Sequence, residues 1–223
     1  MTRLLMLVEG QTEEIFVKQT LTPYLAERGV HVESPIVLWT KRISSGGGFR
    51  GGVTNWNQIR KNLMPMTYDG DAWVTTLLDF YGLPDDFPGY QEAIGPGDPR
   101  LHVRALQDRF AMEIGYARLI PFIALHEFEA WLFSAPDVVA EHFNSVALAA
   151  KVRKAVEQAG EPELINHGPD THPKARLRGM GASYKETSDG PILIEKIGIP
   201  AIRGACSHFA GWLDRLEALG QAA

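Results

Sequence analysis

Short apolar runs at three places in the chain indicate strands that are buried on both faces of a sheet. These runs are Leu4–Val8, Trp73–Leu78 and Arg118–Leu125, and a further strand fits His31–Trp39. Buried strands of parallel sheets read as continuous apolar runs rather than as alternating ones. The pattern therefore predicts four strands, of which the first, third and fourth are largely apolar.

Helical patterns fill the segments between these runs. Thr12 is placed to cap the first helix, with acidic residues in its first turn. Alternation of strands and helices predicts an α/β fold with a mostly parallel sheet flanked by helices, followed by a helical C-terminal part. The expected helices cover Ile15–Leu25, Trp56–Leu63, Leu101–Ile114, a segment beginning at Phe128, Pro136–Val156, Ile192–Ile197 and Cys206–Leu219.

The length of 223 residues predicts a single domain, since domains contain roughly 150 residues. Within residues 1–223 we expect two special segments. One is a Gly-rich basic loop at 41–61, and the other is a helical extension at about 137–223.

Composition narrows the classes of protein to which the chain can belong. The net charge of −5 gives no global attraction to nucleic acid, although local basic patches remain. The single cysteine, Cys206, excludes an internal disulfide and a Cys-rich zinc site. The apolar run before Glu9 is too short for a signal peptide core, and no run is long enough to span a membrane. We therefore expect a soluble cytoplasmic protein.

Acidic residues follow three of the four expected strands. Glu9 comes after the first strand, Asp79 after the third, and Glu127 and Glu129 after the fourth. Glu13 lies one helical turn beyond Glu9, so both can face one crevice. Ligand sites of open parallel sheets form beyond the carboxyl ends of the strands, and Mg²⁺ and Mn²⁺ prefer such oxygen ligands. The pattern predicts a divalent-cation site.

Each acid also has a plainer interpretation. Glu13 and Glu14 could serve only the positive end of the first helix. Glu127 could be a solvated or helix-terminal acid, and Asp79 could cap the turn that follows it. Glu9 is the hardest to explain in this way, because it ends a buried strand and precedes a glycine.

Basic residues gather in two segments that could contact phosphates. Residues 41–61 contain five cations and no acid, and residues 172–186 contain four cations and one acid. The alternative is that these segments are merely solvated loops. The predicted nucleic-acid contacts are Lys41, Arg42, Arg50, Arg60, Lys61, Lys174 and Arg176.

The motif Val-Glu-Gly-Gln-Thr-Glu at residues 8–13 resembles the opening motif of TOPRIM domains, and is most similar to the version in the overcoming-lysogenization-defect (OLD) nucleases. The resemblance implies that Glu9 and Glu13 are metal-site acids. It matches Asp79 to the first acid of an Asp-x-Asp motif, whose second acid is replaced here by Tyr81. Glu129 matches a glutamate after the fourth strand.

Together with Asp-Phe-Tyr-Gly-Leu-Pro at 79–84 and His-Glu-Phe-Glu-Ala-Trp-Leu at 126–132, these motifs resemble one domain-of-unknown-function family, number 4276, over nearly the whole chain. Genes of that family often lie beside ATPase genes in bacterial defence-type clusters, which implies an ATPase partner. The likeness to OLD nucleases also implies a catalytic lysine. Lys185 is the first candidate for it and Lys174 the second.

The sequence thus favours a TOPRIM-like nuclease that depends on Mg²⁺ or Mn²⁺. Glu9, Asp79 and Glu129 would hold the metal, Glu13 and Glu127 would assist, and Lys185 would stabilise the developing charge. One alternative is a non-catalytic TOPRIM-like module that binds nucleotide, nucleic acid or an ATPase. A small-molecule phosphohydrolase is the third reading.

Overall fold

The computed structural model describes residues 1–38, 55–165 and 171–221. Its strand order is β2-β1-β4-β5, with β3 also beside β1 and β6 also beside β4. All pairings in this part of the chain are parallel, which confirms the predicted α/β class. The strands are β1 (Thr2–Val8), β2 (Val30–Val32), β3 (Ile36–Val37), β4 (Trp73–Asp79), β5 (Leu119–Ile120) and β6 (Ile123–Ala124).

The two central strands, β1 and β4, are apolar because both of their faces are covered. Leu4 and Met6 belong to one core, whereas Leu7, which points to the opposite face of β1, belongs to the other. The same alternation separates Leu77 from Leu78 in β4. The sheet is therefore a layer between two hydrophobic cores.

The helices of the first half agree with the predicted ones, apart from the first cap. The helix around Leu101–Ile114 begins earlier, where Asp98 accepts a hydrogen bond from the N–H of Arg100. The prediction that Thr12 caps the first helix is wrong, because Gly10 is the N-cap and Thr12 lies buried in the first turn. The elements are α1 (Gln11–Phe16), the π-helical η1 (Val17–Leu21), α2 (Thr22–Ala26), α3 (Trp56–Leu63), η2 (Met64–Tyr68), η3 (Phe80–Gly82), α4 (Tyr90–Ala93) and α5 (Pro99–Ile114).

After β6, every element in the described part of the chain is helical, which confirms the helical C-terminal part. No helix of the described residues is both long and apolar enough to cross a membrane. These elements are η4 (Phe128–Ser134), α6 (Pro136–His142), α7 (Val146–Ala159), η5 (Pro162–Leu164), α8 (Pro173–Gly179), α9 (Glu186–Ile197), α10 (Ile199–Ala205) and α11 (Ser207–Gln221).

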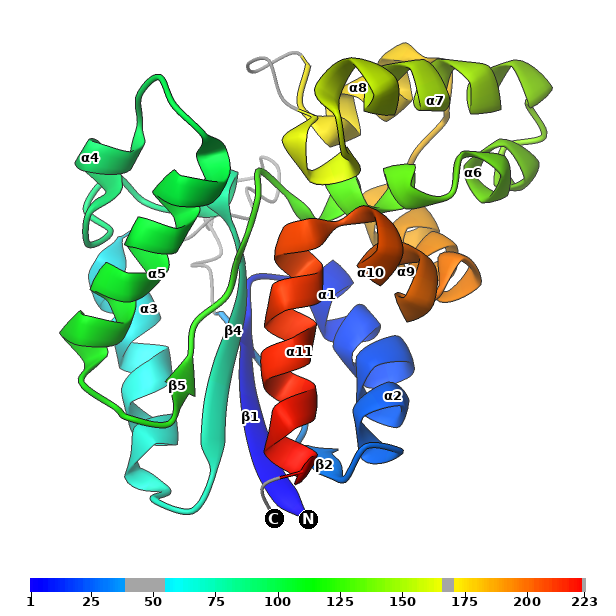
Figure 1. The fold of residues 1–223 in the computed structure, drawn as a ribbon. Coiled ribbons are helices and arrows are strands. Elements are labelled where there is room, and N and C mark those ends of the chain that lie inside the picture. Colours follow the sequence, from blue (N-terminus) through cyan, green and yellow to red (C-terminus); the bar gives the residue numbers. More distant parts are fainter. Residues whose placement is uncertain (39–54, 166–170, 222–223) are drawn as a thin grey trace, which may run out of the picture.

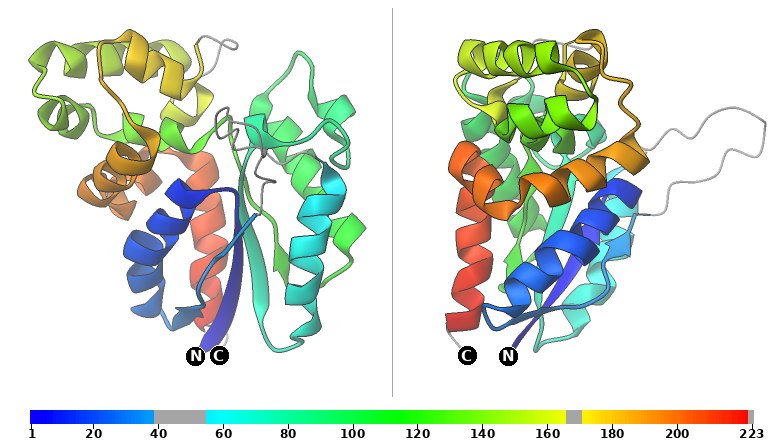
Figure 2. Two further views of the ribbon diagram at one scale, coloured as in Figure 1. Left: turned by 180° about the vertical axis from the view of Figure 1, so that it is seen from behind. Right: turned by 90° about the vertical axis from the view of Figure 1, so that its right-hand side faces the viewer.

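The helices form three groups around the sheet (Figures 1 and 2). Helices α3 and α5 cover one face, and α1, α2 and α11 cover the other. Helices α6, α7 and α8 stand beyond the carboxyl ends of the strands. The helical C-terminal part is thus only partly an extension, because its last helix completes the cover of the sheet.

Two predicted strands are each divided into two short ones, and a proline lies in both interruptions. Pro35 precedes β3, and Pro121 separates β5 from β6; neither can donate a backbone hydrogen bond. Beside Pro121, the hydroxyl of Thr76 accepts a hydrogen bond from the N–H of Phe122 and donates one to its carbonyl, each 2.9 Å long. A side chain thus replaces part of the ladder between β4 and this edge strand.

A buried carboxyl group attaches α11 to the rest of the helical part. The Glu163 carboxyl accepts hydrogen bonds from the backbone N–H groups of His208 and Phe209 and from the indole N–H of Trp131. Burial raises the pKa of Glu163 to about 7, although these donors oppose the shift. The first N–H groups of a helix have no partner within the helix. At the start of α11, Glu163 accepts hydrogen bonds from them out of the core.

The other end of α11 is attached to the beginning of the chain. The hydroxyl of Thr2 donates to the carbonyl of Leu219 at 2.8 Å, and that of Tyr24 donates to Glu217 at 2.6 Å. Gly220 packs so closely that an added Cβ would lie 1.8 Å from the carbonyl oxygen of Arg28. This close approach requires glycine.

Two substitutions within α11 test this packing. Gly220→Ala should lower the free energy of unfolding by roughly 1–3 kcal/mol, because backbone must move to admit the methyl group. Gly211→Ala should instead raise it by about 0.5–1 kcal/mol, since a Cβ there meets no atom within 4 Å and alanine favours helix. Urea unfolding of both variants measures the difference; a Gly220→Ala protein as stable as wild type would contradict the close packing.

Candidate functional site

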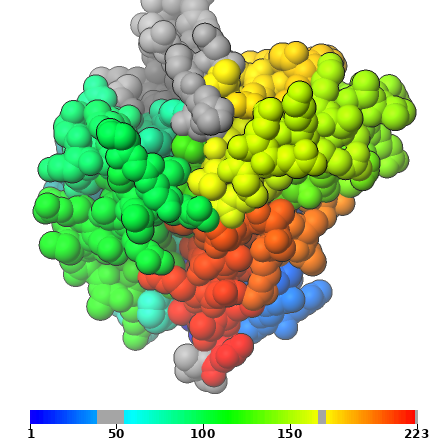
Figure 3. All heavy atoms as spheres, turned by 45° about the horizontal axis from the view of Figure 1, so that its top comes forward, coloured from blue at the N-terminus to red at the C-terminus, as the bar shows by residue number. Residues whose placement is uncertain are grey.

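Carboxyl groups from three strand ends meet at one edge of the sheet. Glu9 follows β1, Asp79 ends β4, and Glu127 and Glu129 follow β6. In the space-filling view, α4 and α5 (green) stand on one side of this end of the molecule, and α7 (yellow-green) and α8 (gold) stand on the other (Figure 3). We use the name acid cluster for Glu9, Glu13, Asp79, Glu127 and Glu129.

Hydrogen bonds link the three strand ends directly. The Oε2 atom of Glu9 accepts from the backbone N–H of Asp79 at 2.9 Å. In turn, Oδ1 of Asp79 accepts from the backbone N–H of Phe128 at 3.0 Å. The carboxyl group of Glu9 is thus held by the end of β4, and that of Asp79 by the start of η4. These hydrogen bonds connect all three strand ends.

Two backbone features make room for these carboxyl groups. A Cβ at Gly82 would lie 2.2 Å from Oε1 of Glu9, so only glycine leaves space for that side chain. His126 has a φ of 67°, which is a strained conformation for a residue with a side chain. It directly precedes Glu127, and strain of this kind is concentrated at functional sites.

Glu13 serves the helix terminus and also belongs to the cluster. Its carboxyl group is buried in the first turn of α1, where the backbone N–H groups of Gly10 and of Glu13 itself bond to it. Burial raises its pKa in spite of these bonds, and the negative charge of Glu186 adds to the shift. The interpretation as a helix-terminal acid is therefore compatible with a place in the site.

Glu127 is held from the helical C-terminal part. Its Oε1 atom lies 2.9 Å from Nδ1 of His172 and accepts from the backbone N–H of Lys174 at 2.5 Å. The side chain is buried, with 5% of the residue exposed, which rules out the alternative of a solvated acid. Helix α8 is thus fastened to the end of β6 through this carboxyl group.

Lys174, and not Lys185, is the lysine that lies among the carboxyl groups. Its Nζ atom is 2.9 Å from Glu186, 3.6 Å from Glu129 and 4.0 Å from Glu127. Burial alone would lower the pKa of Lys174, but these carboxylates outweigh it and raise the pKa. Lys185 is exposed at the start of α9, where its backbone N–H bonds to Asp189. The preference for Lys185 over Lys174 does not agree with this arrangement.

Glu129 has a second partner in the buried side chain of Tyr184. The phenol donates to Oε1 of Glu129 at 3.1 Å. An added Cβ at Gly190 would lie 2.8 Å from the phenol oxygen, so the glycine leaves room for it. Burial, followed by the charge of Glu129, raises the pKa of Tyr184, which keeps the phenol protonated as a donor.

The acids of the cluster repel one another. Burial and the charge of Glu13 raise the pKa of Glu9 to about 7. Burial and Glu127 raise that of Glu129 to about 8. Asp79 has a pKa well above its ordinary value because of burial and the surrounding glutamates. Among the described residues none forms an ion pair with Glu9, Glu13 or Asp79, and the charge of Lys174 only partly offsets the rise in the pKa values of Glu9 and Glu13.

Tyr81 occupies the position of the missing second acid. It is 41% exposed, and its ring lies 5.5 Å from that of His126 and 6.1 Å from that of His172. Burial and the charge of Glu127 raise its pKa to about 12, so the phenol is neutral. Tyr81 therefore supplies an aromatic surface beside the cluster and no negative charge.

The predicted nucleic-acid contacts are spread over different elements. Arg60 and Lys61 are exposed in the last turn of α3. Arg176 lies in α8 and donates to the carbonyl of Thr171. Lys174, also in α8, forms ion pairs with two glutamates of the acid cluster. The remaining three, Lys41, Arg42 and Arg50, lie outside the described residues.

The donor atoms of the cluster fit a hard divalent cation in their chemistry. They are carboxylate oxygens, and their excess negative charge is what such an ion would neutralise. In the described residues, however, no three such side chains are arranged as a ready set of metal ligands. Each of Asp79, Glu127 and Glu129 is instead turned toward a protein donor.

Sequence reasoning missed the partners supplied by the C-terminal part. Tyr184 and Glu186 were not candidates, and Lys174 was ranked behind Lys185. Lys174 lies 45 positions and Tyr184 lies 55 positions from Glu129, which both contact, and no periodic pattern connects them. The clue available in the sequence is the concentration of cations at 172–186.

The raised pKa values predict how stability depends on pH. Glu9 binds its proton more tightly in the folded protein than in the unfolded chain, so its contribution is present below about pH 4.5 and is lost as the pH rises through about 7. Glu9→Gln should therefore melt like wild type near pH 5 and be more stable by on the order of 1–3 kcal/mol at pH 8. Thermal unfolding from pH 5 to 8 in EDTA measures this; lower stability of Glu9→Gln at pH 8 would contradict the repulsion.

Of the comparisons with known proteins, the one with family models agrees with the motifs. A comparison with curated proteins finds no match. Among solved structures, the C-terminal region of the OLD protein of Xanthomonas campestris pv. campestris is similar at 15% identity and a TM-score of 0.35, over 100% of this chain and 98% of that one. We draw neither fold nor function from a structural similarity this low. The family model described as domain of unknown function (DUF4276) matches residues 8–217, and the chain therefore belongs to that family.

Proposed function

We propose that the protein is a metal-dependent phosphodiester hydrolase of the nuclease type. One observation carries the proposal: carboxyl groups from three strand ends form a single hydrogen-bonded network of oxygen donors beside Lys174. The resemblance of residues 8–13 to the opening motif of TOPRIM nucleases supports the same chemistry. The cation is Mg²⁺ or Mn²⁺, according to the hard oxygen donors.

Each residue of the site has its own proposed role. Glu9, Asp79 and Glu129 would hold the metal, with Glu13 beside them. When bound, the ion supplies an activated water and stabilises charge on the phosphate. The ammonium group of Lys174 binds a phosphate oxygen and stabilises its developing charge, which is the role expected earlier of Lys185. Tyr184 is a positioning residue, because it fixes the Glu129 carboxyl through its hydroxyl.

Binding of the substrate backbone is assigned to cations outside the cluster. Arg60 and Lys61 in α3 belong to this group, together with Lys41, Arg42 and Arg50 beyond the described residues. Such contacts hold a strand without reading its sequence. An ATPase partner is part of the proposal on the basis of the family resemblance alone.

A non-catalytic module that binds nucleotide, nucleic acid or an ATPase is the second candidate. Two observations favour it: Lys174 already forms ion pairs with three carboxylates, and Tyr81 stands in place of the second acid. In this reading Lys174 is a structural counter-ion. The two candidates differ in whether a divalent cation binds and whether phosphodiester bonds are cleaved.

Cleavage assays separate the candidates. Single-stranded DNA, duplex DNA and RNA should be tested with Mg²⁺ and Mn²⁺. Lys174→Ala and Asp79→Asn should each slow single-turnover cleavage by about 100-fold or more, because they remove transition-state and metal contacts. Lys185→Ala is the matched control and should retain the wild-type rate. Cleavage by Lys174→Ala at the wild-type rate would exclude its assigned role.

Thermal melting tests the metal independently of activity. A cation that binds only the folded protein raises its melting temperature, so millimolar Mn²⁺ should stabilise the wild type. Asp79→Asn should lose most of that increase, whereas Asp85→Asn, an exposed acid outside the cluster, should keep it. A wild-type melting temperature that does not respond to Mn²⁺ or Mg²⁺ would favour the non-catalytic module.

A further inference from the structure

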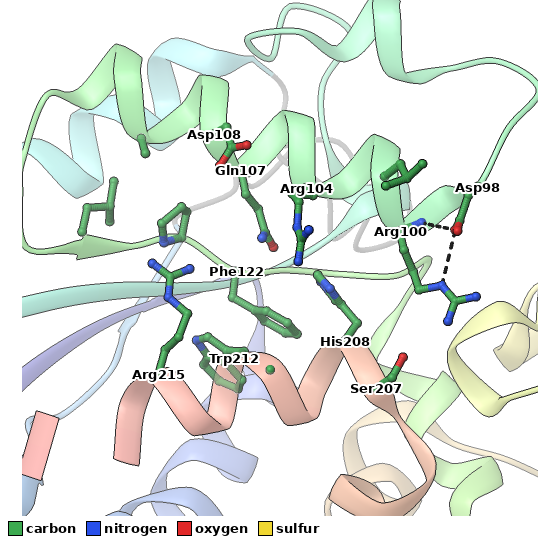
Figure 4. A pocket seen from close by; sticks show the side chains of 15 residues that line it. Asp98, Arg100, Arg104, Gln107, Asp108, Phe122, Ser207, His208, Trp212 and Arg215 are labelled. Atoms are coloured by element: carbon green, nitrogen blue, oxygen red, sulfur yellow. Dashed lines mark hydrogen bonds and ion pairs between the residues drawn. The ribbon is translucent and has the colours of Figure 1, made fainter. Parts of the chain in front are cut away.

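A groove of about 500 Å³ lies between α5 and α11, away from the acid cluster (Figure 4). Its floor is the edge of the sheet, where Pro121 and Phe122 connect β5 to β6. No residue of the acid cluster lines it. A role for this groove therefore neither uses nor requires the proposed hydrolytic site.

The strand at the floor of the groove is closed to pairing with another strand. Pro121 has no N–H, and the N–H of Ile123 donates to Oε1 of Gln107 at 3.0 Å. The carbonyl of Ile123 lies 2.9 Å from Nε2 of His208 and accepts from it. Side chains from both walls thus bond to the N–H and the carbonyl of Ile123. A further β-strand therefore cannot pair with the sheet at this position.

Two arginines enter the groove from opposite walls. Arg104 extends from α5 and Arg215 from α11, as Figure 4 shows. Arg100, at one end, forms ion pairs with Asp98 and Glu161. In the described part of the chain, neither Arg104 nor Arg215 forms an ion pair.

Both arginines are exposed to solvent and are not neutralised by a carboxylate within the groove. Asp108 attracts Arg215 but forms no ion pair with it, and burial lowers the pKa of the guanidinium. His208 is kept neutral, since burial and the nearby arginines lower its pKa. The amide nitrogen of Gln107 donates to no described residue, so it is a further donor on the same wall as Arg104.

A glycine keeps the groove open on the side of α11. Gly211 lies within α11 and lines the groove. A Cβ at that position would meet no atom within 4 Å. An added methyl group therefore fits there without disturbing the packing. The same position therefore offers a way to fill the groove experimentally.

We propose that this groove binds phosphate groups, held between the guanidinium groups of Arg104 and Arg215. A carboxylate also accepts from guanidinium groups, but its acceptor sites lie in one plane, whereas the tetrahedral oxygens of a phosphate can face donors on opposite walls. The volume is that of a site for a nucleotide-sized ligand. The phosphate can belong to a free nucleotide or to the backbone of a nucleic-acid strand.

The test is a calorimetric titration of the full chain in EDTA with ADP, with single-stranded oligodeoxythymidine and with poly-glutamate. Arg104→Ala/Arg215→Ala should weaken phosphate binding roughly tenfold or more. Arg109→Ala/Lys196→Ala is the matched control, because it removes the same charge from exposed positions of α5 and α9 that do not line the groove. Gly211→Leu should weaken binding by filling the groove, with an unchanged circular dichroism spectrum.

Each outcome bears on the proposal. Selective loss of ADP binding in the Arg104/Arg215 variant identifies a nucleotide site, and selective loss of oligodeoxythymidine binding identifies a contact to a strand backbone. The proposal is overturned if neither ligand binds, if the two double variants lose affinity equally, or if poly-glutamate binds as tightly as the phosphates. Since EDTA removes divalent cations, failure here leaves the hydrolase proposal unaffected, and failure of metal-dependent cleavage leaves this one unaffected.

Discussion

Repulsion between like charges at the carboxyl edge of the sheet is the constraint around which the site is built. Parallel strands must end on the same edge, and here β1, β4 and the segment after β6 each deliver acids to it. Their pKa values rise because burial weakens hydration while neighbouring carboxylates approach. The local backbone is adapted to this crowding, through the absence of a side chain at Gly82 and the strained conformation of His126.

The helical C-terminal part stabilises this edge and also completes the fold. Helix α8 supplies Lys174, the segment before α9 supplies Tyr184, and both contact Glu129. Helix α11 covers one face of the sheet and is attached at its start by Glu163. Loss of packing in this part would therefore remove the contacts of Lys174 and Tyr184 with Glu129. The same helices thus determine both the stability of the fold and the geometry of the acid cluster.

The sequence was sufficient to predict the parts that follow local rules. The apolar runs predicted β1 and β4 correctly. The position of an acid at the end of each run identified Glu9 and Asp79 as candidate site residues. Interruptions at Pro35 and Pro121 were missed, although proline lacks the N–H that a continuous ladder needs and both residues carried this signal in the sequence. The bonds between Thr76 and Phe122 beside Pro121 depend instead on the packed fold. The partners of Glu129 were beyond prediction, since they depend on how distant helices pack and not on spacing in the chain.

Divalent-cation binding by the acid cluster is the claim on which the proposed function depends most. Anomalous diffraction from crystals grown with Mn²⁺ tests it directly, because it locates the ion without requiring activity. The account predicts a peak in contact with carboxyl oxygens of Glu9 and Asp79, with direct ligand distances of roughly 2.0–2.6 Å. A structure at saturating Mn²⁺ with no peak at these residues, and with the ion pairs of Lys174 unchanged, would contradict it.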